Sequence, residues 1–192
     1  MESKKIVFVG IDGAGKSSLI AFLKEKLQNQ GKSVKIVFMG WRNLENPLLK
    51  IFVKEGSILK GDDKIKRFRE RSWSFYIAYY LEMYYRYFKV LFSNEDFILI
   101  DRYFYDEIVF SKGFKFKILS FFAPKPDLCV ILKADSKTLK KRGENFSRNR
   151  LEYFYSKIEK VENLCKTLKI NSAKSRDRIF KELKKELNYR DF

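Results

Sequence analysis

The sequence contains no histidine and only two cysteines, Cys129 and Cys165. Without histidine, the chain has no histidine general base, no histidine metal ligand and no histidine-containing catalytic triad. The two cysteines lack the spacing of a metal site, and they are typical of packed thiols in a reduced, cytoplasmic protein. The composition therefore favours chemistry that needs neither histidine nor a disulfide.

A long uncharged apolar run is also missing. The most apolar stretch, residues 73–92, contains Glu82, Arg86 and Lys89 together with many tyrosines, and this argues against a membrane-spanning helix. The first predicted strand begins within a few residues of Met1, so we expect no signal peptide. These features predict a cytoplasmic protein with no membrane partner.

Positive charge, in contrast, is abundant: 41 Lys and Arg residues stand against 24 Asp and Glu residues, a net charge of +17. A basic surface can bind nucleic acid, an anionic membrane or small anionic substrates, or it can be a plain lysine-rich solvated surface. With 192 residues, 45% of them hydrophobic, the chain is expected to form one folded domain spanning residues 1–192.

The most informative motif is the run from Gly10 to Ser17, which fits the phosphate-binding loop pattern G-x-x-x-x-G-K-[ST]. An apolar strand is predicted just before it and an amphipathic helix just after it. Glycines let several amides point at one anion, and the helix adds the positive end of its dipole. Lys16 is expected to reach the terminal phosphates of ATP, and the Ser17 hydroxyl is expected to ligate Mg²⁺. The expected ATP-binding residues of this loop are Gly10, Ile11, Asp12, Gly13, Ala14, Gly15, Lys16, Ser17 and Ser18.

Predicted strands and helices alternate along the chain, which indicates an α/β fold with a parallel sheet covered on both faces. The expected strands cover about 4–10, 33–39, 97–100, 127–132 and 166–171. The expected helices cover about 16–30, 47–54, 63–92, 104–111, 115–122, 136–142, 149–164 and 175–188. Asn149 and Glu152 have the spacing of a capping box, which predicts that a helix opens at Asn149.

An acidic residue, Asp101, ends the apolar strand over 97–100. In a chain that also holds a phosphate-binding loop, an aspartate at this position is suited to bind Mg²⁺ or the waters of Mg²⁺. The alternative is that Asp101 only caps a helix. Arg102 can bind a phosphate with two hydrogen bonds. Tyr103 can pack under a bound molecule that accepts a phosphoryl group, or it can pack in the core, and the sequence does not decide between these roles.

Arginines bracket the polar loop over 143–149. Phosphoryl transfer needs positive charge on the migrating group and exclusion of water, and a mobile lid that carries Arg142, Arg148 and Arg150 would supply both. The alternative is an exposed basic loop. We predict a lid at about 142–150, with Arg142 and Arg148 as catalytic residues.

Segments spread over nearly the whole chain resemble the thymidylate kinase family in order and approximate spacing. They are Phe8–Ser18, Asp101–Tyr103, Pro126–Leu128, the region around Arg142, and Ile170–Ala173. The resemblance implies a nucleoside monophosphate kinase type of P-loop NTPase fold, with three layers and a five-stranded parallel sheet flanked by helices. It also implies transfer of the ATP γ-phosphate to dTMP, giving dTDP and ADP, with Mg²⁺ as cofactor and a homodimer as the usual assembly.

The resemblance extends to individual residues. It implies that Asp12 lies near the acceptor sugar and that Arg102 touches the acceptor phosphate or the transferred group. Ala173 belongs to the loop over 171–174, which the resemblance implies lies near adenine. Arg42, after the second strand, takes the place of a phosphate-binding arginine of the family.

The helix expected over 63–92 is rich in aromatic side chains, for which core packing, a dimer interface and base stacking are all open. Phe68, Trp73 and Phe75 are the candidates to stack on the acceptor base. Arg71, with Arg67 and Arg69 as alternatives, is the candidate for the acceptor-binding arginine that the family carries in this helix.

Two alternatives stay open. Residues 40–47 and 104–107 differ from the usual sequence of the family, so a related kinase could use another nucleotide, a nucleoside or a phosphorylated sugar. A nucleotide-dependent nucleic-acid-binding protein is less favoured, because the lysines are spread along the chain and no recognised nucleic-acid-binding motif is present.

Overall fold

Five parallel strands form the centre of the structure, a computed structural model that describes residues 3–40, 45–47, 49 and 73–187. The strands are β1 (Lys4–Val9), β2 (Val34–Phe38), β3 (Phe97–Asp101), β4 (Leu128–Lys133) and β5 (Thr167–Asn171). Their order across the sheet is β2-β3-β1-β4-β5, and every neighbouring pair is parallel. The predicted five-stranded parallel sheet is therefore confirmed.

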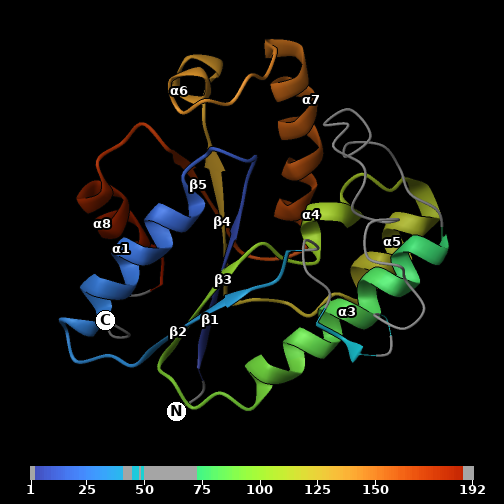
Figure 1. The fold of residues 1–192 in the computed structure, drawn as a ribbon, viewed down its shortest axis with the longest axis horizontal. Coiled ribbons are helices and arrows are strands. Elements are labelled where there is room, and N and C mark those ends of the chain that lie inside the picture. Colours follow the sequence, from blue (N-terminus) through green and yellow to red (C-terminus); the bar gives the residue numbers. More distant parts are fainter. Residues whose placement is uncertain (1–2, 41–44, 48, 50–72, 188–192) are drawn as a thin grey trace.

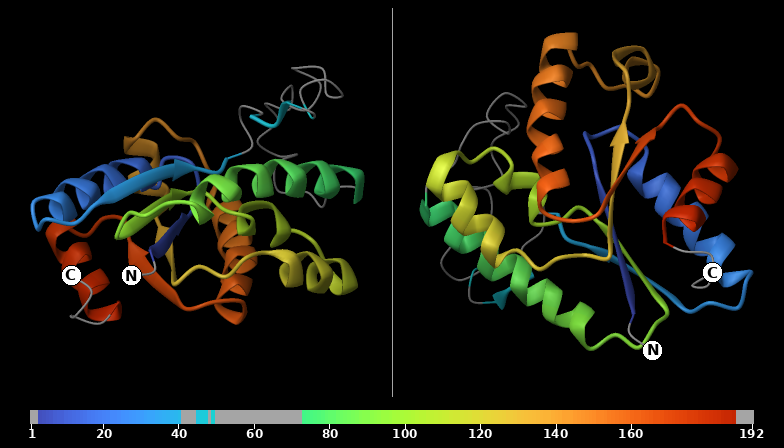
Figure 2. Two further views of the ribbon diagram at one scale, coloured as in Figure 1. Left: turned by 90° about the horizontal axis from the view of Figure 1, so that it is seen from below. Right: turned by 180° about the vertical axis from the view of Figure 1, so that it is seen from behind.

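Helices cover both faces of this sheet. They are α1 (Lys16–Gln28), α3 (Trp73–Leu91), α4 (Tyr105–Ile108), α5 (Gly113–Phe122), α6 (Ser136–Lys141), α7 (Arg148–Ile158), the 3₁₀ helix η2 (Glu159–Asn163) and α8 (Arg176–Glu186). Figure 1 shows α1 and α8 on one side of the sheet and α3, α5 and α7 on the other, and the reverse view in Figure 2 agrees. The right-handed crossover rule accounts for α1 lying opposite α3, α5 and α7, because β1 to β2 runs across the sheet in the opposite direction to the later connections. The last helix, α8, follows β5 and belongs to no crossover.

The core lies where the apolar runs of the sequence predict it. All five residues of β3 and the first five of β4 are buried, since helices cover both faces of the central strands. On α3, the buried positions include Tyr76, Tyr79, Met83 and Tyr87, which recur at helical spacing. Much of the aromatic helix therefore packs in the core, which was one of its three possible roles.

The strand register brings the chemistry to one edge of the sheet. Asp101 at the end of β3 pairs with Phe8 of β1 on one side and with Phe38 of β2 on the other. The carboxyl ends of these three strands therefore meet beside the start of α1. Parallel α/β sheets bind ligands at this edge, next to the point where the strand order changes direction.

One local prediction is wrong. The helix expected to open at Asn149 begins at Arg148, its N-cap is Ser147, and no side-chain hydrogen bond caps it. Glu152, the partner expected in the capping box, forms an ion pair with Arg148 instead. The same helix ends at Ile158 and continues as the 3₁₀ helix η2, where a single helix to about residue 164 was expected.

Two other expected helices lie only partly within the described residues. The helix expected over 63–92 is present from Trp73 to Leu91, and residues 63–72 lie outside the described part of the chain. Most of the helix expected over 47–54 lies outside it as well. Among the described residues, no helix combines the length and the apolar character needed to cross a membrane.

Candidate active site

A cleft of about 770 Å³ opens at the carboxyl ends of β1 and β3. Its lining consists of residues 12–19, Phe38, Asp101, Arg102, Leu132, Arg142, residues 172–176 and Ile179. The phosphate-binding loop, the end of β3 and the loop after β5 thus share one cleft. These segments are far apart in sequence, and the sheet brings them together.

The loop between β1 and α1 has the backbone conformation that its glycines allow. Gly15 is the N-cap of α1 and has a φ of 95°, in the left-handed region where residues with a Cβ are strained. This conformation lets α1 start directly after the loop, so that its first amides face the cleft. The geometry is that of an anion-binding helix start.

Lys16, the loop lysine, is 6% exposed. Its Nζ donates hydrogen bonds to the carbonyl oxygens of Gly10, at 2.8 Å, and Ile11, at 3.0 Å. Burial lowers the pKa of Lys16, the positive charge of Arg102 lowers it further, and nearby aspartates oppose the shift. The ammonium group is therefore held across the loop and lies at the edge of the cleft.

Ser17 and Asp101 make direct contact. The Ser17 hydroxyl donates a hydrogen bond of 2.8 Å to Oδ2 of Asp101, whose side chain is 8% exposed. The other carboxylate oxygen, Oδ1, is buried without a hydrogen-bond partner among the residues that the structure describes. A buried anionic oxygen beside a hydroxyl forms a hard oxygen donor set, which fits Mg²⁺.

Arg102 stands out in its backbone, with a φ of 69°. Left-handed conformation in a non-glycine residue costs energy, and it persists where the surrounding structure fixes it. Its amide donates to Phe8 O at 3.1 Å, and its guanidinium forms an ion pair with Asp12. Burial alone would lower the pKa of Arg102, but the carboxylates of Asp106, Asp12 and Asp101 outweigh it and raise the pKa.

Asp106 is a charged neighbour of the site that sequence reasoning missed. Its Oδ2 accepts a hydrogen bond of 2.9 Å from the backbone amide of Tyr103, and it interacts electrostatically with Arg102 and Lys16. Burial raises the pKa of Asp106 above its ordinary value, although both cations act in the opposite direction. An acidic residue five positions after Asp101 was the available signal.

Tyr103 and Phe75, two expected acceptor contacts, do not line the cleft. The Tyr103 hydroxyl donates to Pro124 O at 3.0 Å, and its ring packs edge-on against Phe104 and Tyr105. Phe75 stacks on Tyr79, with ring centroids 6.0 Å apart. Both side chains pack with core residues, and their roles toward an acceptor stay predictions.

The arginines of the expected lid lie in different surroundings. Arg142 follows α6 and reaches the phosphate-binding loop, where Nη1 donates to Gly13 O at 2.9 Å and Nη2 donates to Ser172 O at 3.3 Å. Arg148 is 87% exposed, pairs with Glu152 at 2.9 Å and does not line the cleft. Arg142 therefore lies at the site in this conformation, and Arg148 lies away from it.

Gly10 and Ile11, two expected ATP-binding residues, do not line the cleft, and their carbonyl oxygens accept the hydrogen bonds of Lys16. Trp73 and Arg150 do not line it either.

Ala173 lines the cleft, and its amide donates to Asn171 Oδ1 at 2.9 Å. Arg42, Phe68 and Arg71 lie outside the described residues, as do Arg67 and Arg69.

Several cleft-lining residues were not expected from the sequence: Leu19, Phe38, Leu132, Ser175, Arg176 and Ile179. Phe38 ends β2 and is 41% exposed. Lys174 and Arg176 precede and begin α8. Lys174 belongs to the loop over 171–174 that was expected near adenine, and Arg176 follows that loop closely, which was the available signal for it.

Comparisons with known proteins agree with this arrangement. A family model described as thymidylate kinase matches residues 8–183. The structure resembles a thymidylate kinase from Candida albicans (TM-score 0.55, 19% identity, covering 97% of this chain and 94% of that one). It also resembles a thymidylate kinase from Ehrlichia chaffeensis (TM-score 0.56, 19% identity, covering 97% and 99%). Both likenesses concern the fold. No curated protein matches the sequence.

Proposed function

The chain belongs to the thymidylate kinase family, and on this premise we propose that it transfers the γ-phosphate of ATP to dTMP, releasing ADP and dTDP. One observation carries the proposal. The loop residues Lys16 and Ser17, the strand-end residue Asp101 and the Asp12–Arg102 pair line a single cleft. These are the groups that a phosphoryl transfer between two phosphates requires.

ATP would bind with its phosphates at the start of α1. The amides of the loop and of the first helical turn supply hydrogen bonds, and the helix dipole favours the negative charge. Lys16 would exchange its bonds to Gly10 O and Ile11 O for bonds to the terminal phosphates. This exchange leaves the ammonium paired in both states, so binding does not require a buried cation without a partner.

Ser17 and Asp101 would hold Mg²⁺ on the phosphates. The orphaned Oδ1 of Asp101 and the adjacent hydroxyl fit a cation that prefers a few protein oxygens and keeps the rest of its shell as water and phosphate. When bound, Mg²⁺ neutralises charge that develops on the transferred group.

The acceptor side needs little acid–base chemistry. A phosphate monoester such as dTMP is largely ionised at neutral pH and attacks without a strong base, so the absence of histidine does not hinder the reaction. Arg102 would orient the acceptor phosphate, and Asp12, its ion-pair partner, would face the acceptor sugar. Catalysis then consists of positioning and of charge stabilisation around the migrating phosphoryl group.

The segment at about 142–150 would close over the phosphates as a lid. Arg142 already contacts the phosphate-binding loop, and Arg148 would reach the transferred group when α6 and α7 approach the cleft. Ala173, with Lys174 and Arg176, would contact the nucleoside part of ATP. Residues 1–192 would act as one domain.

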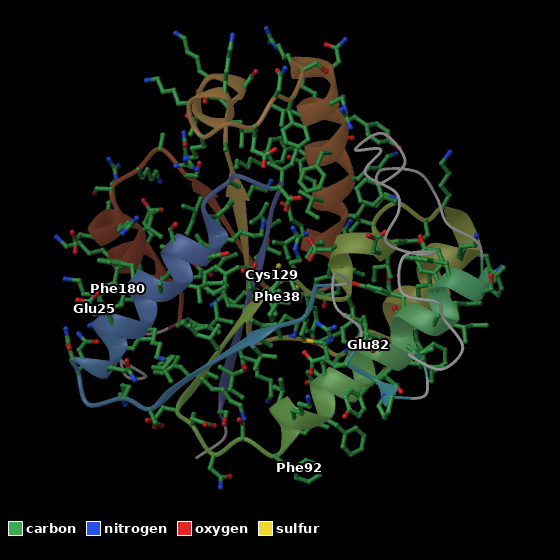
Figure 3. All side chains as sticks on the ribbon, in the orientation of Figure 1. Glu25, Phe38, Glu82, Phe92, Cys129 and Phe180 are labelled. Atoms are coloured by element: carbon green, nitrogen blue, oxygen red, sulfur yellow. The ribbon has the colours of Figure 1, made fainter. Side chains whose placement is uncertain are left out.

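We expect a cytoplasmic homodimer that binds nucleotides and no nucleic acid. The outward side of α3 supports self-association, because it exposes a stripe of apolar side chains at helical spacing, and Figure 3 shows Phe92 projecting from the end of this helix. The exposed residues are Trp73, Ile77, Leu81, Tyr84, Tyr85, Phe88, Leu91 and Phe92. Light scattering should report a dimer, and Phe88→Glu should convert it to a monomer, whereas Phe114→Glu on α5 should leave it a dimer.

The direct test of function is an ADP-release assay with ATP, Mg²⁺ and each common nucleoside monophosphate. We expect turnover with dTMP and a lower kcat/KM with the other acceptors. Turnover with a nucleoside or a phosphorylated sugar and none with dTMP would replace the proposed acceptor. Absence of acceptor-dependent turnover with every compound would refute a kinase function.

A further inference from the structure

Glu82 and Arg86 form a buried ion pair on α3, outside the cleft. They lie one helical turn apart, and their side chains are 0% and 2% exposed. Arg86 Nε and Nη2 each approach Glu82 Oε1 at 2.7 Å. Figure 3 shows Glu82 on the part of α3 near the middle of the molecule. Removing two charges from water is costly, and further hydrogen bonds must offset the cost.

Within the described part of the chain, the further hydrogen bonds of the pair go to the backbone of one segment, from Phe38 at the end of β2 to Asn46. Arg86 Nη1 also lies 3.9 Å from the Glu45 carboxylate. Arg86 Nη1 donates to Gly40 O at 2.8 Å and to Phe38 O at 3.2 Å. The Glu82 carboxylate accepts from the amide of Glu45 at 2.7 Å and from the amide of Asn46 at 3.0 Å. The cation thus holds carbonyls before residues 41–44, and the anion holds amides after them.

The first of these anchors is in contact with the active site. Gly40 packs so closely against Arg102 that a Cβ on Gly40 would lie 2.7 Å from Arg102 Cδ. Phe38, whose carbonyl Arg86 also holds, lines the cleft. A continuous path of contacts therefore leads from the Glu82–Arg86 pair through Gly40 to the arginine that pairs with Asp12.

The second anchor has support of its own. The Glu45 carboxylate receives Lys89 Nζ at 2.6 Å, again from α3. Asn46 Nδ2 also donates to Leu81 O at 3.5 Å. Both ends of the segment that contains Arg42 are therefore fixed to the same helix.

We propose that Glu82 and Arg86 are positioning residues for the acceptor. The pair sets the separation and orientation of the two ends of residues 40–45, and it holds Gly40 against Arg102. This inference rests on the proposed function, in which Arg102 orients the acceptor phosphate. Packing of α3 on the sheet does not require the pair, because apolar side chains of similar volume perform that task at lower cost.

Three changes test the proposal. Glu82→Gln keeps the shape of the side chain but leaves the amide of Glu45 or of Asn46 without an oxygen acceptor. Arg86→Lys keeps the charge but loses the fork that binds both Glu82 and the carbonyls. The double change Glu82→Met with Arg86→Met removes the pair without leaving a buried charge, so it protects the experiment against a variant that does not fold.

Two measurements are made on each variant. Amide hydrogen exchange followed by NMR should become faster at Glu45 and Asn46, with the smallest effect in Arg86→Lys. In steady-state assays, KM for dTMP should rise about tenfold or more while KM for ATP stays within about twofold, because only the acceptor segment is displaced. A purely structural role would lower the active fraction, and with it kcat, and would leave both KM values unchanged.

Lys160→Met provides a matched control. Lys160 Nζ also bridges two backbone carbonyls, those of Val109 and Ser111 at 2.9 and 3.0 Å, but away from the cleft. Its removal should affect stability without raising KM for dTMP.

The outcomes separate this inference from the proposed function. Unchanged exchange at Glu45 and Asn46, or faster exchange with an unchanged KM for dTMP, would overturn the positioning role. A wild-type protein that does not phosphorylate dTMP would instead overturn the proposed function. The exchange measurement, with KM for whichever acceptor supports turnover, would then decide the role of the pair.

Discussion

The hydroxyl of Ser17 donates a hydrogen bond of 2.8 Å to Oδ2 of Asp101, which joins the first turn of α1 to the carboxyl end of β3. The two residues are 84 positions apart in the sequence. Their contact leaves Oδ1 of Asp101 buried and without a partner among the described residues. A site with one satisfied and one orphaned carboxylate oxygen is ready to receive a cation.

Asp101→Asn tests this cation site. The amide keeps an oxygen that can accept from Ser17, so the fold should persist, but the negative charge is lost. We expect kcat to fall about 100-fold or more and Mg²⁺ to strengthen ATP binding much less than in the wild type. Calorimetric titration of ATP with and without Mg²⁺ measures the difference. Asp127→Asn, just before β4, is the matched control, and an equal loss there would contradict the assignment.

Lys16→Ala should abolish phosphate transfer. The side chain bonds to two loop carbonyls that can be hydrated in its absence, so the apo fold should lose little stability. We expect turnover to fall about 100-fold or more, because the charge on the terminal phosphates is no longer compensated. Turnover and thermal unfolding are measured on the same preparation. A variant that unfolds under the conditions in which the wild type is stable would show that Lys16 is chiefly structural.

Asp106→Asn should make the apoprotein more stable at neutral pH. The pKa of Asp106 in the folded state is raised above its ordinary value of 3.8. Between pH 3.8 and that raised pKa, the folded state therefore binds more protons than the unfolded state. The free energy of unfolding of the wild type therefore falls as pH rises through this window, and the variant escapes that loss. Urea denaturation from pH 4 to 8 should show that the free energy of unfolding of the variant exceeds that of the wild type by an amount that grows with pH and then levels off.

Asp96→Asn serves as a control of opposite sign for that experiment. Hydrogen bonds from the backbone and hydroxyl of Ser33 lower the pKa of Asp96, so its ionisation stabilises the fold above the ordinary pKa. The Asp96→Asn variant should therefore lose stability relative to the wild type as pH rises. If Asp106→Asn also lost stability relative to the wild type as pH rises, the raised pKa of Asp106 would be disproved.

Arg148→Ala tests the lid. In the structure Arg148 is exposed and pairs with Glu152, outside the cleft, so its removal should not affect ATP or dTMP binding in the open state. If the lid closes as proposed, kcat should fall about tenfold or more with little change in KM. Glu152→Ala breaks the same ion pair and should leave kcat unchanged. A rise in KM for dTMP with unchanged kcat would remove Arg148 from the lid role.

The fold and the phosphate half of the site could be predicted because their signals are local. The loop motif, with a strand before it and a helix after it, predicts an anion site within eight residues, from Gly10 to Ser17. Asp101 was found because it ends an apolar strand, and parallel strands bring their carboxyl ends to one edge. The start of α7 was predicted wrongly because Ser147 and Asn149, two positions apart, can both cap a helix. The spacing from Asn149 to Glu152 favoured Asn149, but the N-cap is Ser147.

The surroundings of these residues could not be predicted in this way. Asp106 and Phe38 belong to the site only because of how α4 packs and where β2 ends against β3. The buried Glu82–Arg86 pair appeared in the sequence only as charges that interrupt an apolar helix. The proposed role of the pair depends on its hydrogen bonds to backbone groups about 40 residues earlier in the chain.

By itself, the sequence determined the strand–helix alternation, the position of the anion-binding loop and the type of chemistry. These depend on apolar periodicity, glycine placement and side-chain pKa, which are properties of short segments. Only the tertiary structure decided that Asp12 pairs with Arg102, that the Ser17 hydroxyl donates to Asp101, and that the Glu82–Arg86 pair is buried. The physical reason is that the strength of an electrostatic contact depends on distance and burial, and for Asp12 with Arg102 and for Ser17 with Asp101 both are set by how the loop and α1 lie against the end of β3.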